Sequence, residues 1–249
     1  MQNQYQREQT ITAAFSDRRC ELGVYRAILL LQDAMTEYFY HNEIDAIHIG
    51  PTHGVLWAVA RSKIQYDGMP RWMDTVRFRI FPVKVSPVTI HLNMVVETLE
   101  GETLLRCRQE LCAMDSRDHS LRRVDSTPFP MDLDLLPPVM DAPFRRKKVA
   151  VGPEDLAHLH TIRTADTDKN HHMNNAEYVR LIENAFPTDF WDRYRVLDFD
   201  IHYVTEGKER EVLEVFRQQD GNEWAVVIKC GDRTLIKAFL LVEERGEEE

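Results

Sequence analysis

Apolar and polar residues alternate along much of this chain, and the alternation predicts half-buried antiparallel strands. In Val88–Leu99 every second residue from Val88 to Val96 is apolar, and its neighbours are mostly polar. The same two-residue period runs through residues 197–203, 224–230 and 236–242. Successive side chains of a strand point to opposite faces, so this pattern indicates sheets with one face on a core.

Two helical patterns interrupt the predicted strands. Residues Leu22–Phe39 carry apolar side chains at the 3.6-residue period, and the middle of this segment, AILLLQDAM, is apolar on most sides. We therefore expect a sheet to wrap around this helix. A second helix is predicted over roughly Asn174–Phe186, and Pro187 should end it because a residue before proline disfavours helical backbone.

The predicted elements come twice in the same order: strand, helix, then about four strands. A shift of 151 residues places Thr161 on Thr10 (161 − 10 = 151) and Asp168 on Asp17. The two halves therefore look like an internal repeat. A long helix across a curved antiparallel sheet is the hot-dog layout. We expect an α+β chain of two tandem hot-dog domains that form an internal pseudo-dimer.

A proline-rich stretch separates the two halves. Five prolines lie in Asp125–Lys148, and they exclude continuous helix or central strand there. The expected domains are residues 1–124, an extended linker at 125–152, a second domain at 153–243, and an acidic tail at 244–249.

Composition and charge narrow the class of protein. The chain is 43% hydrophobic, no apolar run reaches the ~18 residues of a membrane span, and the start MQNQYQREQ lacks a signal-peptide layout. The net charge of −10 argues against nucleic acid as the main partner. The four cysteines show neither CxxC nor zinc spacing, which favours free thiols and a cytoplasmic location.

Short polar side chains cluster immediately before the second predicted helix, from Asp166 to Asn175. Exposed N–H groups and the helix dipole favour negative charge at a helix N-terminus, so this place suits an oxyanion. Asn174 or Asn175 could also serve simply as a helix cap. The first half has lost the cluster, because Glu21 stands where the shift places His172.

Two other chemistries fit the cluster less well. His171 and His172 are adjacent and would point apart, and no second ligand group lies one helical turn away as in HExxH. We therefore predict no metal and no cofactor. A serine nucleophile is not expected either, because the chain has no G-x-S-x-G motif.

The segment DTDKNHHMNNAEYVRLIENAFP resembles the D-x-N-x-H-x-N-N-x-x-Y signature of the acyl-acyl-carrier-protein (acyl-ACP) thioesterases of the plant and bacterial type. In the first half, VLWAVARSKIQYDGMPRWMDTVRF is similar to the family's strand-turn-strand passage. The resemblance covers nearly the whole chain in layout and is strong in motif from Asp166 to Pro187. It implies two tandem hot-dog domains joined by a long linker, with the catalytic set in the second.

Matched residue by residue, the family's catalytic Asp, Asn and His fall on Asp168, Asn170 and His172. The family also has a Glu-Cys pair that begins 34 residues after the histidine. Here 172 + 34 = 206 gives Glu206, and the next residue is Gly207 instead of cysteine. A cysteine nucleophile at that position is excluded, and a water-based mechanism remains.

The resemblance implies hydrolysis of fatty acyl-ACP to free fatty acid and ACP. A carboxylate, Glu206 or Asp168, would activate a water as general base with help from His172. Asn170 would position this network or the substrate. Amides near Asn174 and Asn175 would stabilise the oxyanion.

The resemblance also implies where substrate binds. The acyl chain would enter the first domain beside its helix, and the candidate wall residues are Val24, Ile28, Leu31, Trp57, Met69 and Trp72. ACP is acidic, so we expect a locally basic docking surface. Its candidates are Arg145, Arg146, Lys147, Lys148, Lys208 and Arg210.

Alternatives stay open on the sequence alone. The chain could act on acyl-CoA, because the D-x-D-x-x-x-H spacing from Asp166 also resembles small CoA thioesterases. It could instead be a non-catalytic acyl-binding or regulatory module. Chain-length preference and assembly into a homodimer are not fixed by these patterns.

Overall fold

The computed structural model describes residues 1–140 and 142–246, and the chain divides into two compact units. The first unit comprises Met1–Leu22 and Leu29–Ala142, and the second comprises Gly23–Ile28 and the chain from Pro143 onward. The division at 142/143 falls inside the proline-rich stretch. Residues 247–249 of the expected acidic tail lie outside the described residues. Within the described part of the chain, no helix is long and apolar enough to cross a membrane.

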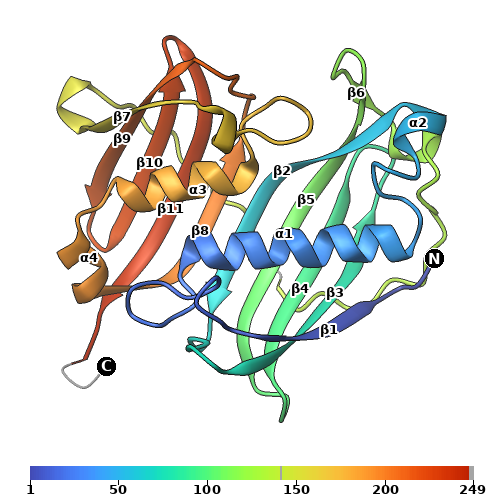
Figure 1. Cartoon of the computed structure of the whole chain (residues 1–249), viewed down its shortest axis with the longest axis horizontal. Helices are drawn as coiled ribbons and strands as arrows, with labels where there is room; N and C mark the ends of the chain where they lie inside the picture. The colour runs from blue at the N-terminus through green and yellow to red at the C-terminus, as the bar shows by residue number, and fades with distance from the viewer. Residues whose placement is uncertain (141, 247–249) are drawn as a thin grey trace. The chain divides into compact units, whose positions relative to one another are not determined.

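The first unit is an antiparallel sheet with the long helix α1 (Val24–His41) across one face (Figure 1). Its strands are β1 (Tyr5–Thr10), β2 (Val55–Tyr66), β3 (Thr75–Val85), β4 (Ile90–Thr98), β5 (Thr103–Asp115) and β6 (Leu121–Arg122). The order is β1-β3-β4-β5-β2, with the short β6 beside β5. The one-turn helices α2 (Gly50–His53) and η1 (Val124–Ser126) lie in its connections.

Helix α1 lies on the sheet because one side of it is fully apolar. Leu30, Leu31, Ala34 and Tyr38 are 0–1% exposed. The predicted helix began at Leu22, but Leu22 instead donates its N–H to the carbonyl of Pro70, and α1 starts two residues later. Burial of this apolar stripe is the main force that holds the helix on the sheet.

The other face of the first sheet is covered by the proline-rich stretch. Met140 is 2% exposed, and the Val139 N–H donates to the Asn93 side-chain oxygen at 2.9 Å. Strand β4 is therefore buried on both faces over Ile90–Val96. The stretch predicted as a linker runs extended, but its first part packs on the first unit.

The second unit repeats the layout. Its elements are η2 (Pro153–Asp155), β7 (Leu156–Thr161), η3 (Thr164–Asp166), α3 (Asn175–Asn184), α4 (Thr188–Arg193), β8 (Tyr194–Tyr203), β9 (Val212–Asp220), β10 (Glu223–Cys230) and β11 (Arg233–Glu244). The sheet order is β8-β11-β10-β9-β7, every pairing is antiparallel, and α3 lies across one face (Figure 1). Pro187 ends the helical run as predicted and caps the N-terminus of α4.

The 151-residue shift found in the sequence coincides with the bounds of the elements. It carries β1 onto β7, because 5 + 151 = 156 and 10 + 151 = 161. It also carries the first residue of α1 onto the first residue of α3, because 24 + 151 = 175. Each unit is thus one hot-dog layout, and the chain is α+β with two such units in tandem.

Candidate active site

The polar segment before α3 is a tight turn closed by backbone hydrogen bonds. The Asp168 N–H donates to the carbonyl of His172 at 2.9 Å, and the His171 N–H donates to the carbonyl of Asp168 at 3.0 Å. The Asp168 carboxylate accepts the Asn170 N–H at 2.8 Å. His171 has φ +61° and is exposed, whereas His172 is partly buried. The turn thereby selects one of the two histidines.

The first unit contains the same turn at the shift of 151. The Asp17 N–H donates to the carbonyl of Glu21 at 2.8 Å, and the Asp17 carboxylate accepts the Arg19 N–H at 2.8 Å. Cys20 has φ +61°, as His171 does. Since the backbone and the aspartate are shared, the aspartate contributes to the turn in both units. The side chains that differ are those at the positions of Asn170 and His172.

His172 meets a carboxylate from another connection of the same unit. Its Nδ1 lies 3.2 Å from Glu206 Oε2, and the two side chains are 14% and 42% exposed. Glu206 lies in the connection between β8 and β9, which is fixed to the turn by the Met173 N–H donating to the Gly207 carbonyl at 2.9 Å. A carboxylate at Nδ1 favours the tautomer with its proton there, so the lone pair is on Nε2.

The start of α3 supplies one open backbone donor. Asn174 is the N-cap: its side-chain oxygen accepts the Ala176 N–H at 2.8 Å, and its carbonyl accepts the Glu177 N–H at 3.0 Å. In the described part of the chain the Asn175 N–H has no hydrogen-bond partner. The cap interpretation of Asn174 is thus correct, and the amide of Asn175 is the donor that can face an anion.

A buried carboxylate that sequence reasoning used only for its spacing, Asp166, holds both ends of this segment. Asp166 is 5% exposed and accepts hydrogen bonds from His160 Nε2 at 2.8 Å, the Arg163 N–H at 2.8 Å and Arg180 Nη2 at 2.7 Å. Its carbonyl accepts the N–H of Asn174 at 2.9 Å. Burial tends to raise the pKa of Asp166, but these hydrogen bonds and the charges of His160 and Arg180 hold it below its usual value.

The network continues from Asp166 to the first turn of α1. Arg180 also donates to Glu177 at 2.5 Å, and the other oxygen of Glu177 accepts the Tyr25 hydroxyl at 2.9 Å. The Tyr25 N–H donates to Glu183 at 2.8 Å. Two glutamates of α3 therefore hold Tyr25. The spacing of Glu177 and Arg180 is visible in the sequence, but the contact of Glu177 with Tyr25, 152 positions away, is not.

Comparisons with known proteins point to one family. Residues 152–245 match the family model described as acyl-ACP thioesterase C-terminal domain. An acyl-[acyl-carrier-protein] hydrolase of Cuphea viscosissima is 23% identical over 201 residues, which are 78% of this chain and 47% of the relative. A dodecanoyl-[acyl-carrier-protein] hydrolase of Umbellularia californica is 22% identical over 71% of this chain and 48% of the relative. The second half of the chain thus matches the C-terminal domain of acyl-ACP thioesterases, and the chain is similar to acyl-ACP hydrolases over more than two thirds of its length.

Solved structures of proteins named as acyl-ACP thioesterases share the fold. One from Bacteroides thetaiotaomicron has a TM-score of 0.81 at 16% identity and covers 97% of this chain and 98% of its own. A 12:0-ACP thioesterase from Umbellularia californica has a TM-score of 0.84 at 17% identity and covers 98% of this chain and 99% of its own. The chain spans about half the length of the two curated relatives described above.

The structure leaves little room for a cysteine side chain after Glu206. A Cβ at Gly207 would lie 2.7 Å from Ile162 Cδ1 and 2.8 Å from the Tyr178 hydroxyl oxygen. That hydroxyl accepts the Gly207 N–H at 2.8 Å, and burial raises the pKa of Tyr178, which keeps it protonated. The tyrosine of the family signature therefore fixes the backbone that carries Glu206.

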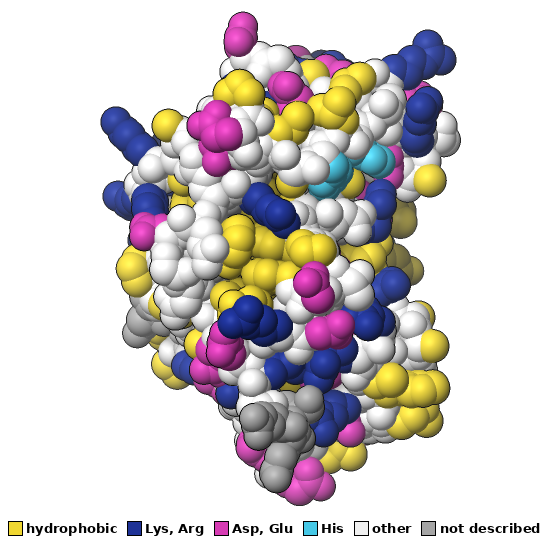
Figure 2. All heavy atoms as spheres, turned by 90° about the vertical axis from the view of Figure 1, so that its left-hand side faces the viewer, with side chains coloured by type: hydrophobic (Ala, Val, Ile, Leu, Met, Phe, Trp, Pro, Cys, Tyr) yellow, Lys and Arg dark blue, Asp and Glu magenta, His cyan; other side chains and the backbone are white. Residues whose placement is uncertain are grey.

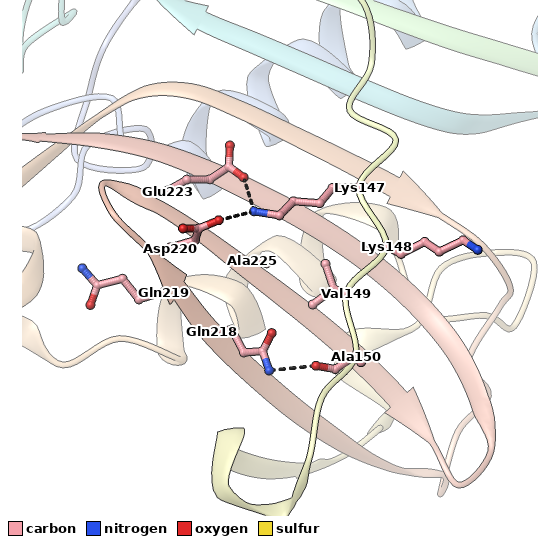
Figure 3. A pocket seen from close by; sticks show the side chains of 9 residues that line it. All are labelled: Lys147, Lys148, Val149, Ala150, Gln218, Gln219, Asp220, Glu223 and Ala225. Atoms are coloured by element: carbon pink, nitrogen blue, oxygen red, sulfur yellow. Dashed lines mark hydrogen bonds and ion pairs between the residues drawn. The ribbon is translucent and has the colours of Figure 1, made fainter.

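Two of the predicted docking residues are engaged inside the second unit. Arg145 pairs with Asp198 at 3.2 Å and with Glu223, and Lys147 pairs with Asp220 at 2.6 Å and with Glu223 at 3.5 Å. Figure 3 shows Lys147 directed at the two acids, beside a small pocket lined by the β9–β10 hairpin. These ion pairs hold the segment after Pro143 on the hairpin. The Arg145 side chain is 23% exposed and that of Lys147 is 47% exposed, and their docking role stays a prediction.

The other predicted docking residues are exposed. Arg146, Lys148, Lys208 and Arg210 all face solvent. Lys208 stands next to Gly207 and pairs through its backbone with His172. On the face that Figure 2 presents, basic and acidic side chains are interspersed around a central hydrophobic group, with no single-sign patch. Lys208 and Arg210 are close in the chain to Glu206 of the candidate site.

The predicted acyl-binding residues are placed unevenly. Val24, Ile28 and Leu31 are 1–3% exposed. Trp57 is partly buried and donates its ring N–H to the Ile44 carbonyl at 2.7 Å. Met69 and Trp72 lie on the turn between β2 and β3; Met69 is half-buried, but Trp72 is 52% exposed. Trp72 therefore lies on the surface of the unit, which does not support its role as a wall residue.

The Asp166 network gives a pH-dependent prediction. A pKa held below 3.8 in the folded state contributes stability above that value, and the contribution is lost as pH falls through the folded pKa. We expect Asp166→Asn to lower the free energy of unfolding by about 2 kcal/mol at pH 7. The deficit should shrink below pH 3.8. Urea unfolding of both proteins at pH 7 and pH 3 measures this. An equal deficit at both pH values would contradict the charge network.

The contacts of Gly207 give a second prediction. Gly207→Ala should lower the free energy of unfolding by about 1–3 kcal/mol, because the added methyl group must displace Ile162 or Tyr178. Gly207→Cys should do the same and should gain no activity. Thermal unfolding measures the change, and Gly246→Ala is the control, because its Cβ meets nothing within 4 Å and its φ lies outside the left-handed region, as that of Gly207 does. An unchanged melting temperature for Gly207→Ala would show that the site has room.

Proposed function

We propose that this chain hydrolyses the thioester of a fatty acyl chain carried on acyl carrier protein, and that it releases free fatty acid and ACP. The observation that carries this proposal is the His172–Glu206 pair, 3.2 Å apart, beside the N-terminus of α3. The names of the curated relatives, which are acyl-[acyl-carrier-protein] hydrolases, support the choice of substrate.

We propose that the pair activates the water. Glu206 holds the Nδ1 proton of His172, and His172 Nε2 accepts a proton from water as the oxygen attacks the thioester carbonyl. The proton can then pass to the leaving sulfur as the C–S bond breaks. Of the two carboxylates that the sequence left open, Glu206 is the better candidate, because Asp168 repeats the role that Asp17 has in a turn without a histidine.

The tetrahedral intermediate carries a negative oxygen that needs donors. The amide of Asn175, in the first turn of α3, is the proposed donor, because Asn174 already satisfies the next two amides. Asn170, whose side-chain nitrogen lies 3.5 Å from Asp168, is proposed to position the substrate or the water. The Asn175 amide and the Asn170 side chain both belong to the segment that leads from the turn into α3.

We also propose that the first unit binds the acyl chain between α1 and its sheet. The inward side of α1 and the facing strands are apolar there, and aliphatic chains bind to such surfaces. Assembly into a homodimer and a cytoplasmic location stay predictions, and size-exclusion chromatography and cell fractionation test them.

The deciding experiment is a hydrolysis assay with one ladder of acyl chain lengths on ACP and the same ladder on CoA. We expect kcat/KM on ACP to exceed that on CoA by about tenfold or more, because only the carrier protein contributes a docking surface. Higher kcat/KM on CoA would favour an acyl-CoA thioesterase. Tight binding of both ladders without hydrolysis would indicate an acyl-binding module.

The catalytic assignment is tested by three variants on the best substrate. His172→Ala and Glu206→Gln should each lower kcat by about 100-fold or more, the usual loss of a general base or its partner. Asp168→Asn keeps an acceptor oxygen for the Asn170 N–H, so its loss should be smaller than that of Glu206→Gln. Circular dichroism would confirm that each variant folds. A larger loss for Asp168→Asn would reassign the carboxylate.

The docking surface is tested by reversing charge beside the site. The double variant Lys208→Glu, Arg210→Glu should raise KM for acyl-ACP by about tenfold at low ionic strength, because the carrier is acidic. The same variant should leave KM unchanged for an uncharged N-acetylcysteamine thioester of the same acyl group. High salt should remove the difference between the variant and the wild-type protein.

A matched control is the double variant Arg146→Glu, Lys148→Glu, which makes the same change of charge at two other exposed positions. We expect a smaller rise in KM for it, because those residues are in the segment held on the β9–β10 hairpin. Equal effects of the two double variants would mean that net charge, rather than a local surface, governs docking.

A further inference from the structure

A polar pair interrupts the apolar inner face of the first unit. Along β5 the buried, inward residues are Leu105, Cys107, Gln109, Leu111 and Ala113, and four of these five are apolar or a thiol at 0% exposure. Gln109 is 4% exposed. In the sheet register it stands opposite Ser62 on β2 and opposite Leu92 on β4. Ser62 is 1% exposed, so both polar side chains are enclosed on this face.

The rows on either side of this pair are apolar. The next row across the sheet contains Ile64, Cys107 and Met94, and the row on the other side contains Leu111 and Ile90; each of these five side chains is 0% exposed. The alternate residues of β5, such as Arg108 and Glu110, point to the opposite face. Gln109 and Ser62 therefore share a face with the apolar rows. Trp57, paired with Ala113 on this face, contacts Phe39 of α1 with ring centroids 5.8 Å apart, so α1 covers this face.

The hydrogen bonding of Gln109 is incomplete. Its Nε2 donates to Ser62 Oγ at 3.1 Å, but its Oε1 has no hydrogen-bond partner among the described residues. If the amide were turned over, Oε1 would accept from the serine hydroxyl and Nε2 would lack a partner instead. In either orientation one end of a buried amide is unsatisfied, and this is costly.

On the opposite face of the same sheet, a buried side-chain amide has hydrogen-bond partners at both ends. Asn93, on β4, is 0% exposed, and its side-chain oxygen accepts the Val139 N–H while its nitrogen donates to the Leu92 carbonyl. The extended segment that covers that face therefore satisfies the amide at both ends. On the α1 face no such segment reaches Gln109, and an outside group with a hydrogen-bonding atom would complete it.

We propose that Gln109 and Ser62 recognise an oxygen on the acyl chain, so that the preferred substrate is a hydroxylated fatty acyl group. This inference rests on the proposed function, because the ligand is the acyl chain of that substrate. A hydroxyl both donates and accepts, so it suits either orientation of the amide. An unsubstituted chain on this apolar face leaves the amide unsatisfied, whereas a chain with a hydroxyl at the matching carbon satisfies it.

Binding of free fatty acids tests the inference without hydrolysis. Isothermal titration of the full wild-type chain would compare dodecanoic acid with hydroxydodecanoic acids whose hydroxyl is at successive carbons. We expect one positional isomer to bind about tenfold more tightly than dodecanoic acid, the order of gain from one buried hydrogen bond. Affinities within twofold of dodecanoic acid for every isomer would overturn the inference, and the amide would then be satisfied by water only.

Variants assign the preference to the pair. Gln109→Met keeps the volume and removes the amide, so the ratio of the two affinities should fall to about one. Gln65→Met is the matched control, because Gln65 is on the opposite face of β2, and the ratio should stay at about tenfold. If Gln109→Met fails to fold, Ser62→Ala should weaken the preference severalfold. A preference that survives in Gln109→Met or Ser62→Ala would overturn the assignment.

The outcomes separate this inference from the proposed function. Hydrolysis of unsubstituted acyl-ACP together with equal binding of all the fatty acids would leave the proposed function standing and remove the hydroxyl preference. Tight binding of one hydroxylated isomer without hydrolysis of any acyl-ACP would support the hydroxyl preference and contradict the proposed function.

Discussion

The candidate site depends on one constraint of the backbone, the closed turn from Asp168 to His172. The hydrogen bond from the Asp168 N–H to the His172 carbonyl fixes where the next residues point, and the left-handed His171 turns its own ring to solvent. His172 is then left facing Glu206 at 3.2 Å. The helix that follows starts from a defined N-cap. One rigid segment therefore positions the His172 imidazole and the Asn175 amide relative to the Glu206 carboxylate.

Two further contacts keep that segment in place, and both come from residues of the family signature or its neighbours. Tyr178 accepts the Gly207 N–H and thereby ties the connection that carries Glu206 to α3. Asp166 ties the start of the segment to Arg180 one and a half turns into the helix. Because each anchor is buried and hydrogen-bonded, moving the turn costs free energy, and the His172–Glu206 pair can be held in place without substrate.

Much of the fold could be predicted from the sequence, because alternation and helical period are local. The strands around Ile90–Thr98 and Glu223–Cys230 followed from alternation, and the shift of 151 residues anticipated where α1 and α3 begin. Contacts between residues far apart in the chain have no such local pattern and could not be predicted. The partnership of Glu177 with Tyr25 joins residues far apart in the chain, and the basic run after Pro143 gave no sign that Arg145 would be bound by Asp198 and Glu223.

The comparison of the two turns explains why duplication matters for this chain. The first unit keeps the aspartate and the left-handed residue but has Arg19 and Glu21, which form an ion pair at 3.8 Å, where the second unit has Asn170 and His172. The turn of the first unit therefore holds a salt bridge and no histidine. The proposed catalytic geometry does not constrain the first unit. Its inner face is then constrained only by packing and by what it binds. On such a face a buried amide with one unsatisfied end costs free energy, and this cost is the reason for proposing that Gln109 meets a ligand.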